Sequence, residues 1–264
     1  MSEEIIKSYK GFDKDLKCRG FQYEIGKEYE HNGPVKACYS GFHACEAPLD
    51  VFKYYAPGRQ SRYCEVEQSG KTDRDGEDTK VASSKIKIGA EIGIPGLVKA
   101  QIEWTKERAS KQGTATSGEE SSAATSGYRS SAATSGSGSS AATSGDWSSA
   151  ATSGYRSSAA TSGDWSSAAT SGYRSSAATS GSGSSAATSG EESSAATSNA
   201  NAIALACGKN SKAKGVIGSY IVLTEWDAEQ ENLLLASMVR IDGEIYKPDI
   251  WYTLKDGEIV EAAT

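Results

Sequence analysis

The heptad SSAATSG recurs eight times without insertion from Ser121, and SSAATSN follows at residues 193–199. A two-residue spacer separates the units, so the period is nine residues. Self-similarity at a short fixed period is typical of a solenoid, in which each unit buries its surface against its neighbours. The composition also fits a flexible linker, because it offers little apolar area to offset chain entropy. We favour the solenoid, since the spacing continues from Asn199 to Gly208, beyond the last perfect copy.

Each unit places six residues without Gly or Pro before its glycine, a pattern that predicts a short strand followed by a tight turn. One unit makes a very cramped coil, so we predict a parallel β-roll of about 18 residues per coil, with two strands and two turns. We also expect the glycine to adopt the left-handed conformation, because Asn199 replaces it and asparagine enters that region at modest cost.

The segment AIALACG at residues 202–208 bears on which face points inward. Its large residues Ile203, Leu205 and Cys207 occupy the slots that carry Ser, Ala and Ser in the perfect copies. Because strand side chains alternate between faces, we assign these slots to the interior. The outer face then shows rows of the remaining small residues, as exemplified by Ser157, Ala159 and Thr161.

The spacers are the only variable part of the array. In an 18-residue coil, alternate spacers stack on the same edge, which places Tyr155 over Tyr173 on one edge and Trp147 over Trp165 on the other. The strand spacing of about 4.7–4.9 Å then builds aromatic ladders. The candidate binding residues are those of the aromatic spacers: Tyr128, Arg129, Asp146, Trp147, Tyr155, Arg156, Asp164, Trp165, Tyr173 and Arg174.

The segments flanking the array read as ordinary globular sequence that caps a mainly β solenoid. In residues 1–93 we expect an α+β domain with strands and one short helix, at Gly20–Ile25, Tyr63–Gln68, Ser84–Ile88 and Pro48–Tyr55. The remaining predicted parts are a capping helix at 94–112 closing the lower end, the solenoid at 113–219, and an antiparallel C-terminal β cap at 220–264. Asp242-Gly243 and Asp256-Gly257 mark hairpins in that cap.

Charge and composition exclude several classes of partner. The net charge is −6 and the pI about 5.2, without a cluster of Lys and Arg, so neither nucleic acid nor an anionic membrane is expected as a partner. No apolar run approaches the length of about 18 residues that a membrane span needs. The N-terminus does not resemble a secretory signal, which favours a cytoplasmic location. There the five cysteines are expected to be free, mostly buried thiols, and no cofactor is predicted.

Four alternatives concern a nucleophile pair, a zinc site, a calcium site and an ice-binding face. His43 and Cys45 are two residues apart, so they share one side of a strand and form a candidate nucleophile pair or, with Cys38, Cys18 and Cys64, a zinc site. The acidic segment DRDGED (73–78) suits calcium but lacks the distal Glu of an EF-hand. Flat rows of Thr, Ser and Ala are similar to the faces of some ice-binding solenoids.

The segments SGFHACEAPLDVFKYY (40–55), CRGFQYEIGKEYEH upstream and EIGIPGLVKAQIEW downstream carry a family resemblance. There the chain resembles uncharacterised bacteriophage and prophage proteins that pair an N-terminal domain of unknown function with Ala/Ser/Thr/Gly nonapeptide repeats. This resemblance implies a phage or bacterial origin and no catalytic residues. NAIALACGKNSKAKG (201–215) is similar to the roll repeats in heads of trimeric autotransporter adhesins, which would imply oligomerisation. The identity of the units fits recent duplication or an engineered consensus array.

These observations favour a non-enzymatic protein of phage type. We expect a rigid β-solenoid that presents its edge ladders for self-association, as a homo-oligomer, or to another protein. The alternatives left open are an ice-binding solenoid and an enzyme or metal site around His43 and Cys45.

Overall fold

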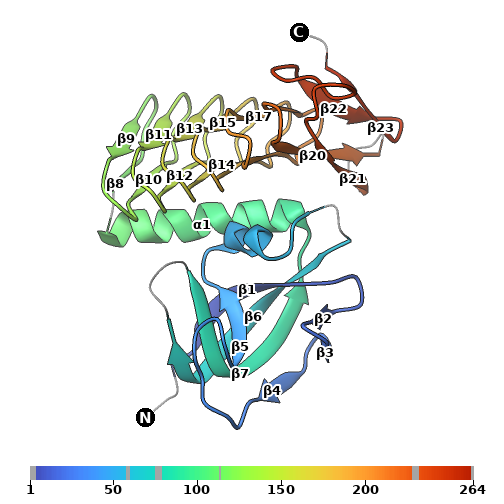
Figure 1. The fold of residues 1–264 in the computed structure, drawn as a ribbon. Helices are drawn as coiled ribbons and strands as arrows, with labels where there is room; N and C mark the ends of the chain where they lie inside the picture. The colour runs from blue at the N-terminus through green and yellow to red at the C-terminus, as the bar shows by residue number, and fades with distance from the viewer. Residues whose placement is uncertain (1–3, 58–59, 75–78, 113, 228–231, 263–264) are drawn as a thin grey trace. The chain divides into compact units, whose positions relative to one another are not determined.

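The computed structural model describes residues 4–57, 60–74, 79–112, 114–227 and 232–262. The chain divides into two compact units, Met1–Leu97 and Val98–Thr264. The first unit combines β-strands with a short 3-10 helix, and the second combines the repeat solenoid with a long α-helix (Figure 1). The division falls inside that helix, α1 (Ile94–Gln112).

The first unit is built on a five-stranded antiparallel sheet in the order β4-β7-β5-β1-β6. Because β6 also pairs with β7, the strands β7, β5, β1 and β6 form a closed ring. A two-stranded hairpin of β2 and β3 and the 3-10 helix η1 complete the unit. The bounds are β1 (Ile6–Phe12), β2 (Lys17–Cys18), β3 (Phe21–Gln22), β4 (Glu28–Glu30), β5 (Phe42–Cys45), η1 (Pro48–Lys53), β6 (Arg62–Asp73) and β7 (Lys80–Glu91).

Most of the predicted elements of this unit are present, with longer strands. β6 and β7 contain the predicted strands at 63–68 and 84–88, whereas only residues 21–22 of the predicted strand at 20–25 are extended in a ladder. The predicted helix is a 3-10 helix that ends at Lys53. Of the acidic segment considered for calcium, Asp73 lies in β6 and accepts the Ala37 N–H (2.7 Å), while residues 75–78 lie outside the described part of the chain.

The central repeat folds into a parallel β-solenoid, as the period predicts. Strands two units apart pair in register, for example Ala141 with Ala159 and Ala150 with Ala168, so one coil takes 18 residues. The even sheet comprises β8 (Thr114–Thr116), β10 (Ser131–Thr134), β12 (Ser149–Thr152), β14 (Ser167–Thr170), β16 (Ser185–Thr188) and β18 (Ile203–Ala206). The odd sheet comprises β9 (Ser122–Thr125), β11 (Ser140–Thr143), β13 (Ser158–Thr161), β15 (Ser176–Thr179), β17 (Ser194–Thr197) and β19 (Lys212–Lys214).

The interior of the solenoid is the face opposite to the one predicted. Ser157, Ala159 and Thr161 are at most 4% exposed and point toward the axis, with their equivalents in the other coils. The residues between them on the odd sheet, such as Ala160, are exposed. The rows considered for ice binding are therefore buried, and the rows that the odd sheet exposes carry Ser and Ala in place of Thr.

The interior serines hold the turns of neighbouring coils together. The Ser175 hydroxyl accepts the N–H of Ser157 (3.1 Å) and donates to the carbonyl oxygen of Gly154 (3.0 Å), so it satisfies two backbone groups of one turn in the preceding coil. The same pair of bonds recurs along the column of first serines. The interior threonines differ, because Oγ1 of residues such as Thr179 is buried without a hydrogen-bond partner among the described residues.

The repeated glycine is required by a close approach, which corrects the expected left-handed conformation. A Cβ added to Gly163 would overlap the carbonyl oxygen of Gly145 in the preceding coil. Gly163 has no positive φ; the left-handed residue is the second residue of each spacer, for example Trp165 at φ 56° and Arg174 at φ 55°. Glycine is therefore selected for its missing side chain, which lets successive turns lie in contact.

The helix α1 lies along the even sheet, and not over the end of the solenoid as predicted (Figure 1). Its buried side chains, among those that the structure describes, share one helical face and are Leu97, Val98, Gln101, Ile102, Thr105 and Ala109. The outward alanines of β10, β12, β14 and β16, such as Ala151, are at most 3% exposed, whereas those of the odd sheet are open to solvent. With 19 residues, α1 is about 28 Å long, enough to cover the roughly 24 Å between β8 and β18.

Coverage by α1 explains why the interior was misassigned. Ile203, Leu205 and Cys207 lie on the outer face of the even sheet, the face that α1 covers. Leu205 and Cys207 are fully buried there. These large side chains therefore pack on the outside of the coil. Its narrow interior is filled by Ala, Ser and Thr.

The C-terminal segment extends both solenoid sheets. β20 (Tyr220–Trp226) continues the even sheet in parallel, and β21 (Leu233–Arg240) pairs with it antiparallel. β22 (Tyr252–Lys255) adds antiparallel to the odd sheet and forms a hairpin with β23 (Glu258–Glu261). The hairpin predicted at Asp256-Gly257 is confirmed, with φ of 52° and 80°. Asp242-Gly243 instead lies between β21 and β22, where Asp242 Oδ1 accepts three successive backbone N–H groups at 2.9 Å.

Candidate functional site

The turns of the solenoid place the spacer residues on two opposite edges. One edge carries the turns from odd to even strands, with spacers 128–129, 146–147, 164–165 and 182–183. The other edge carries spacers 119–120, 137–138, 155–156, 173–174 and 191–192. All ten predicted binding residues lie in these turns, and the structure brings together those that the 18-residue coil predicts to stack.

Two aromatic stacks define the edge ladders. The rings of Tyr155 and Tyr173 lie 5.7 Å apart, centre to centre, with an angle of 12° between their planes. The rings of Trp147 and Trp165 lie 5.8 Å apart at 19°. Near-parallel stacking at this distance contributes about 0.5–1.5 kcal/mol beyond area burial. Both ladders stay accessible, since Tyr155 and Trp165 are 42% and 43% exposed.

Cations lie beside the tyrosine rings. The guanidinium groups of Arg156 and Arg174 lie 5.1 Å from the ring centres of Tyr155 and Tyr173, within the range of a cation–π interaction. Tyr128, which is 61% exposed, is paired with Arg129 at 5.6 Å in the same way but on the opposite edge.

The tyrosine ladder ends in an ion pair. Glu192 accepts hydrogen bonds from Arg174 Nε (2.6 Å) and from Tyr173 Oη (2.8 Å). These bonds, with the one from Arg174 first, lower the pKa of Glu192, and the same carboxylate raises the pKa of both partners. Because the three groups are solvent-exposed, the pair fixes orientation more than it stabilises the fold.

The aspartates of the other edge cap the turns of the next coil. Asp146 Oδ1 accepts the N–H of Asp164 (2.9 Å), and Asp164 Oδ1 accepts the N–H of Ser182 (2.7 Å). Each carboxylate therefore satisfies a backbone donor one coil away, while the adjacent tryptophan ring stacks along the edge. The acidic spacer residues thus have a structural task that is independent of any partner.

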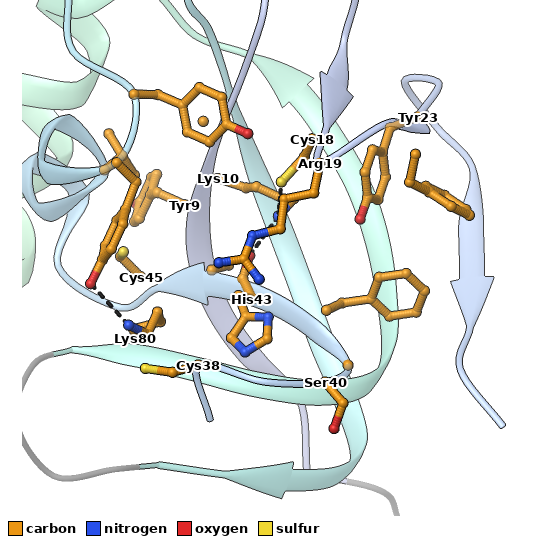
Figure 2. Close-up of a pocket in the computed structure, with 18 of the residues that line it drawn as sticks. Tyr9, Lys10, Cys18, Arg19, Tyr23, Cys38, Ser40, His43, Cys45 and Lys80 are labelled. Atoms are coloured by element: carbon orange, nitrogen blue, oxygen red, sulfur yellow. Dashed lines mark hydrogen bonds between the residues drawn. The ribbon is translucent and has the colours of Figure 1, made fainter. Parts of the chain in front are cut away.

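A second candidate site is a cavity of about 640 Å³ in the first unit. It is bordered by β1, the β2–β3 hairpin, β5, the segment around Tyr54 and Tyr55, and the start of β7 (Figure 2). His43 and Cys45, which the sequence picked out as a pair, both line it from alternate positions of β5. Burial, the largest cause, and then Lys10 lower the pKa of His43, so its imidazole is neutral near pH 7.

Lys10 is the most unusual residue of the cavity. It lies on the inward face of β1 and is only 5% exposed. Its Nζ donates to the carbonyl oxygen of His43 (2.7 Å) and lies 3.5 Å from Sγ of Cys18. Burial lowers its pKa, with a smaller opposing effect from Cys18. Cys18 in turn is hydrogen-bonded with Tyr55, whose pKa is raised mainly by burial.

The cysteines do not assemble as a metal site would require. Cys18, Cys38 and Cys45 all line the cavity, but no group of three or more His, Cys, Asp or Glu side chains among the described residues is arranged to hold a metal ion. Cys64 lies in the core of the strand ring, where burial raises the pKa of its thiol to about 11. All five cysteines are free thiols.

The sequence-based search overlooked Lys10 and Arg19. One signal was available: in IKSYKGF (6–12), Lys10 shares the alternating register of Ile6, Ser8 and Phe12, which places a lysine on the buried face of a strand. Arg19 carried no comparable signal, because its position in a hairpin turn became apparent only from the structure.

Residues 6–100 match the model of a family described as a domain of unknown function, DUF7666, so the first unit carries a DUF7666 domain. The match stops within α1 and does not include the repeat. No curated protein and no solved structure matches the chain. None of the described helices is long and apolar enough to cross a membrane.

Proposed function

We propose that this protein is a non-enzymatic scaffold whose solenoid presents the two edge ladders to a second copy of the chain or to another protein. The observation that carries the proposal is the pair of exposed aromatic stacks, Tyr155–Tyr173 and Trp147–Trp165, on opposite edges of one hydrogen-bonded coil. The phage or bacterial origin and the cytoplasmic location expected from the sequence belong to the same proposal.

The stacks suit protein binding because their geometry is set before a partner arrives. Tyr, Trp and Arg are the side chains that most often dominate binding energy at protein interfaces. Each ring here is held by its neighbour one coil away and by the backbone of a short turn. Little side-chain entropy is therefore lost on association, which favours affinity.

The two edges are also complementary in charge at mid-height. Arg156 and Arg174 each lie against the neighbouring tyrosine of one edge, and Asp146 and Asp164 directly precede the tryptophans of the other. Side-by-side contact between copies would therefore place arginines against aspartates and tyrosine rings against tryptophan rings. Complementary charge of this kind steers association and fixes register more than it raises affinity.

The array supplies its own neutral replacement for testing this proposal, because Ser-Gly spacers already stand at 137–138 and 182–183. We would replace spacers 155–156 and 173–174 with Ser-Gly and compare the mass of the parent and the variant by light scattering over a micromolar concentration range. The second spacer position has φ near 55°, so glycine fits it without strain.

We expect the parent to form a defined oligomer and the variant to be monomeric with an unchanged circular dichroism spectrum. Replacing Glu119-Glu120 with Ser-Gly on the same edge is the matched control, and it should behave as the parent does. A parent that stays monomeric at every concentration, or a ladder variant that associates as strongly as the parent, would refute self-association through the ladders.

A further inference from the structure

The cavity of the first unit is lined by several basic side chains. Three basic side chains, Lys10, Arg19 and Lys80, line it together with His31 and His43. No Asp or Glu appears among its described lining residues, although the chain as a whole has 34 acids and 28 bases. A concave surface with basic side chains and no acid among its described lining residues favours the binding of anions.

The buried amino group of Lys10 marks the place inside the cavity where an anion would bind. Its hydrogen bond to the His43 carbonyl and its contact with Cys18 leave it without a carboxylate partner among the described residues. Its Nζ lies 5.6 Å and 5.4 Å from the rings of Phe12 and Tyr23. Rings offset the cost of burying a cation only partly, and an anion beside Nζ would offset much more of it.

Arg19 adds a second cation from an unfavourable backbone position. Arg19 and Gly20 form the two-residue loop of the β2–β3 hairpin, with φ of 49° and 81°. That geometry favours Asn-Gly, so arginine at its first position is held at a cost. Its guanidinium makes no hydrogen bond or ion pair with a described residue, and Figure 2 shows it reaching over the cavity toward His43 and Lys10. An arginine placed this way is suited to bidentate contact with a carboxylate or phosphate.

The wall beside these cations is aromatic. Phe21 and Phe42 line the cavity with Tyr23 between them, at ring-centre distances of 4.8 Å from Phe21 to Tyr23 and 6.2 Å from Tyr23 to Phe42. Phe21 is 46% exposed, which is unusual for a phenylalanine with so many neighbouring rings. Planar apolar groups pack well against such a wall. The volume of about 640 Å³ lies within the range of about 300–1,000 Å³ typical of small-molecule sites.

We propose that this cavity binds a small organic anion, with its carboxylate or phosphate between Lys10 and Arg19 and a planar apolar group against Phe21 and Phe42. Nε2 of His43, which is buried and has no hydrogen-bond partner among the described residues, supplies a further polar contact inside the same cavity. This site belongs to the first unit and is independent of the edge ladders.

The test titrates the full-length protein by calorimetry with four probes: benzoate, phenyl phosphate, inorganic phosphate and the uncharged benzyl alcohol. We expect at least one of benzoate and phenyl phosphate to bind saturably at one site, and which one does identifies the anionic group. Inorganic phosphate and benzyl alcohol should each bind at least about tenfold more weakly than the better of benzoate and phenyl phosphate.

The Arg19→Asn variant separates binding from folding, since asparagine suits the hairpin loop better than arginine. It should weaken the binding of the anionic probes about tenfold or more, while the melting temperature stays the same or rises. The matched control is Lys87→Gln, which removes an exposed cation 3.6 Å from Glu67 on the same unit and should leave binding unchanged. The proposal is overturned by the absence of saturation up to about 10 mM, by equal binding of benzyl alcohol, or by unchanged affinity in Arg19→Asn.

Discussion

Ser175→Ala and Thr179→Val test how the solenoid interior is held together. Both residues belong to the same unit and face the same narrow axis, at 1% and 4% exposure. Each change removes one hydroxyl group, and each leaves the backbone conformation allowed. The structure nevertheless predicts opposite effects on the free energy of unfolding.

The Ser175 hydroxyl satisfies the Ser157 N–H and the Gly154 carbonyl, both of which lie in the preceding turn. Alanine leaves both backbone groups buried without a partner. At about 1–2 kcal/mol for each unsatisfied group, Ser175→Ala should lower the free energy of unfolding by about 2–4 kcal/mol. The Thr179 hydroxyl has no hydrogen-bond partner among the described residues, so valine replaces a buried polar group with a methyl group of similar size. Thr179→Val should therefore raise stability by about 1 kcal/mol.

The assay is urea unfolding followed by circular dichroism, with the slope compared between variants so that a shift in midpoint reports stability. Loss of stability in Thr179→Val as large as that in Ser175→Ala would refute the reasoning. It would mean that the threonine column is hydrogen-bonded, for example to a file of buried water.

Two further predictions concern glycine packing and alkaline stability. Gly163→Ala should prevent the native stack, because the new Cβ overlaps Gly145, whereas Gly127→Ala, with its nearest contact 3.9 Å away, should leave thermal unfolding nearly unchanged. Burial raises the pKa of the Cys207 thiol from 9.0 to about 12, so the stability it contributes is complete below pH 9 and is lost as pH rises toward 12. Cys207→Ala should flatten the fall in melting temperature between pH 9 and 11; an unchanged slope would contradict this assignment.

The architecture of the array was predictable because the length of the repeat determines which strands pair and in which register. Nine residues per strand and turn fix a two-stranded coil, and the coil alone decides that Tyr155 stacks on Tyr173. The inward face was not predictable, since Ser and Ala occupy both faces of every strand and polarity does not separate them. The large residues at 203–207 led to the wrong inward face because they lie on the outer face that α1 covers, and α1 is distant in the sequence.

The role of the repeated glycine and the cavity of the first unit could not be predicted from the sequence, for different reasons. Glycine permits both a positive φ and a close approach, and the sequence does not distinguish these uses. The cavity forms where β1, β5 and the β2–β3 hairpin come together, which places residues 10, 43 and 19 around it from separate strands and turns. The adjacency of Cys45 and His43 was visible in the sequence, whereas the cations around them come from distant positions.

Coverage of only one sheet by α1 limits how the array can change its length. Insertion of a single nonapeptide would shift every later strand to the opposite sheet. Leu205 and Cys207 would then move from the face that α1 covers to the face that is open to solvent. A pair of nonapeptides would restore the assignment and add one full turn of the roll. Duplications that preserve the fold should therefore add nonapeptides in pairs, although the sequence repeats after every single nonapeptide.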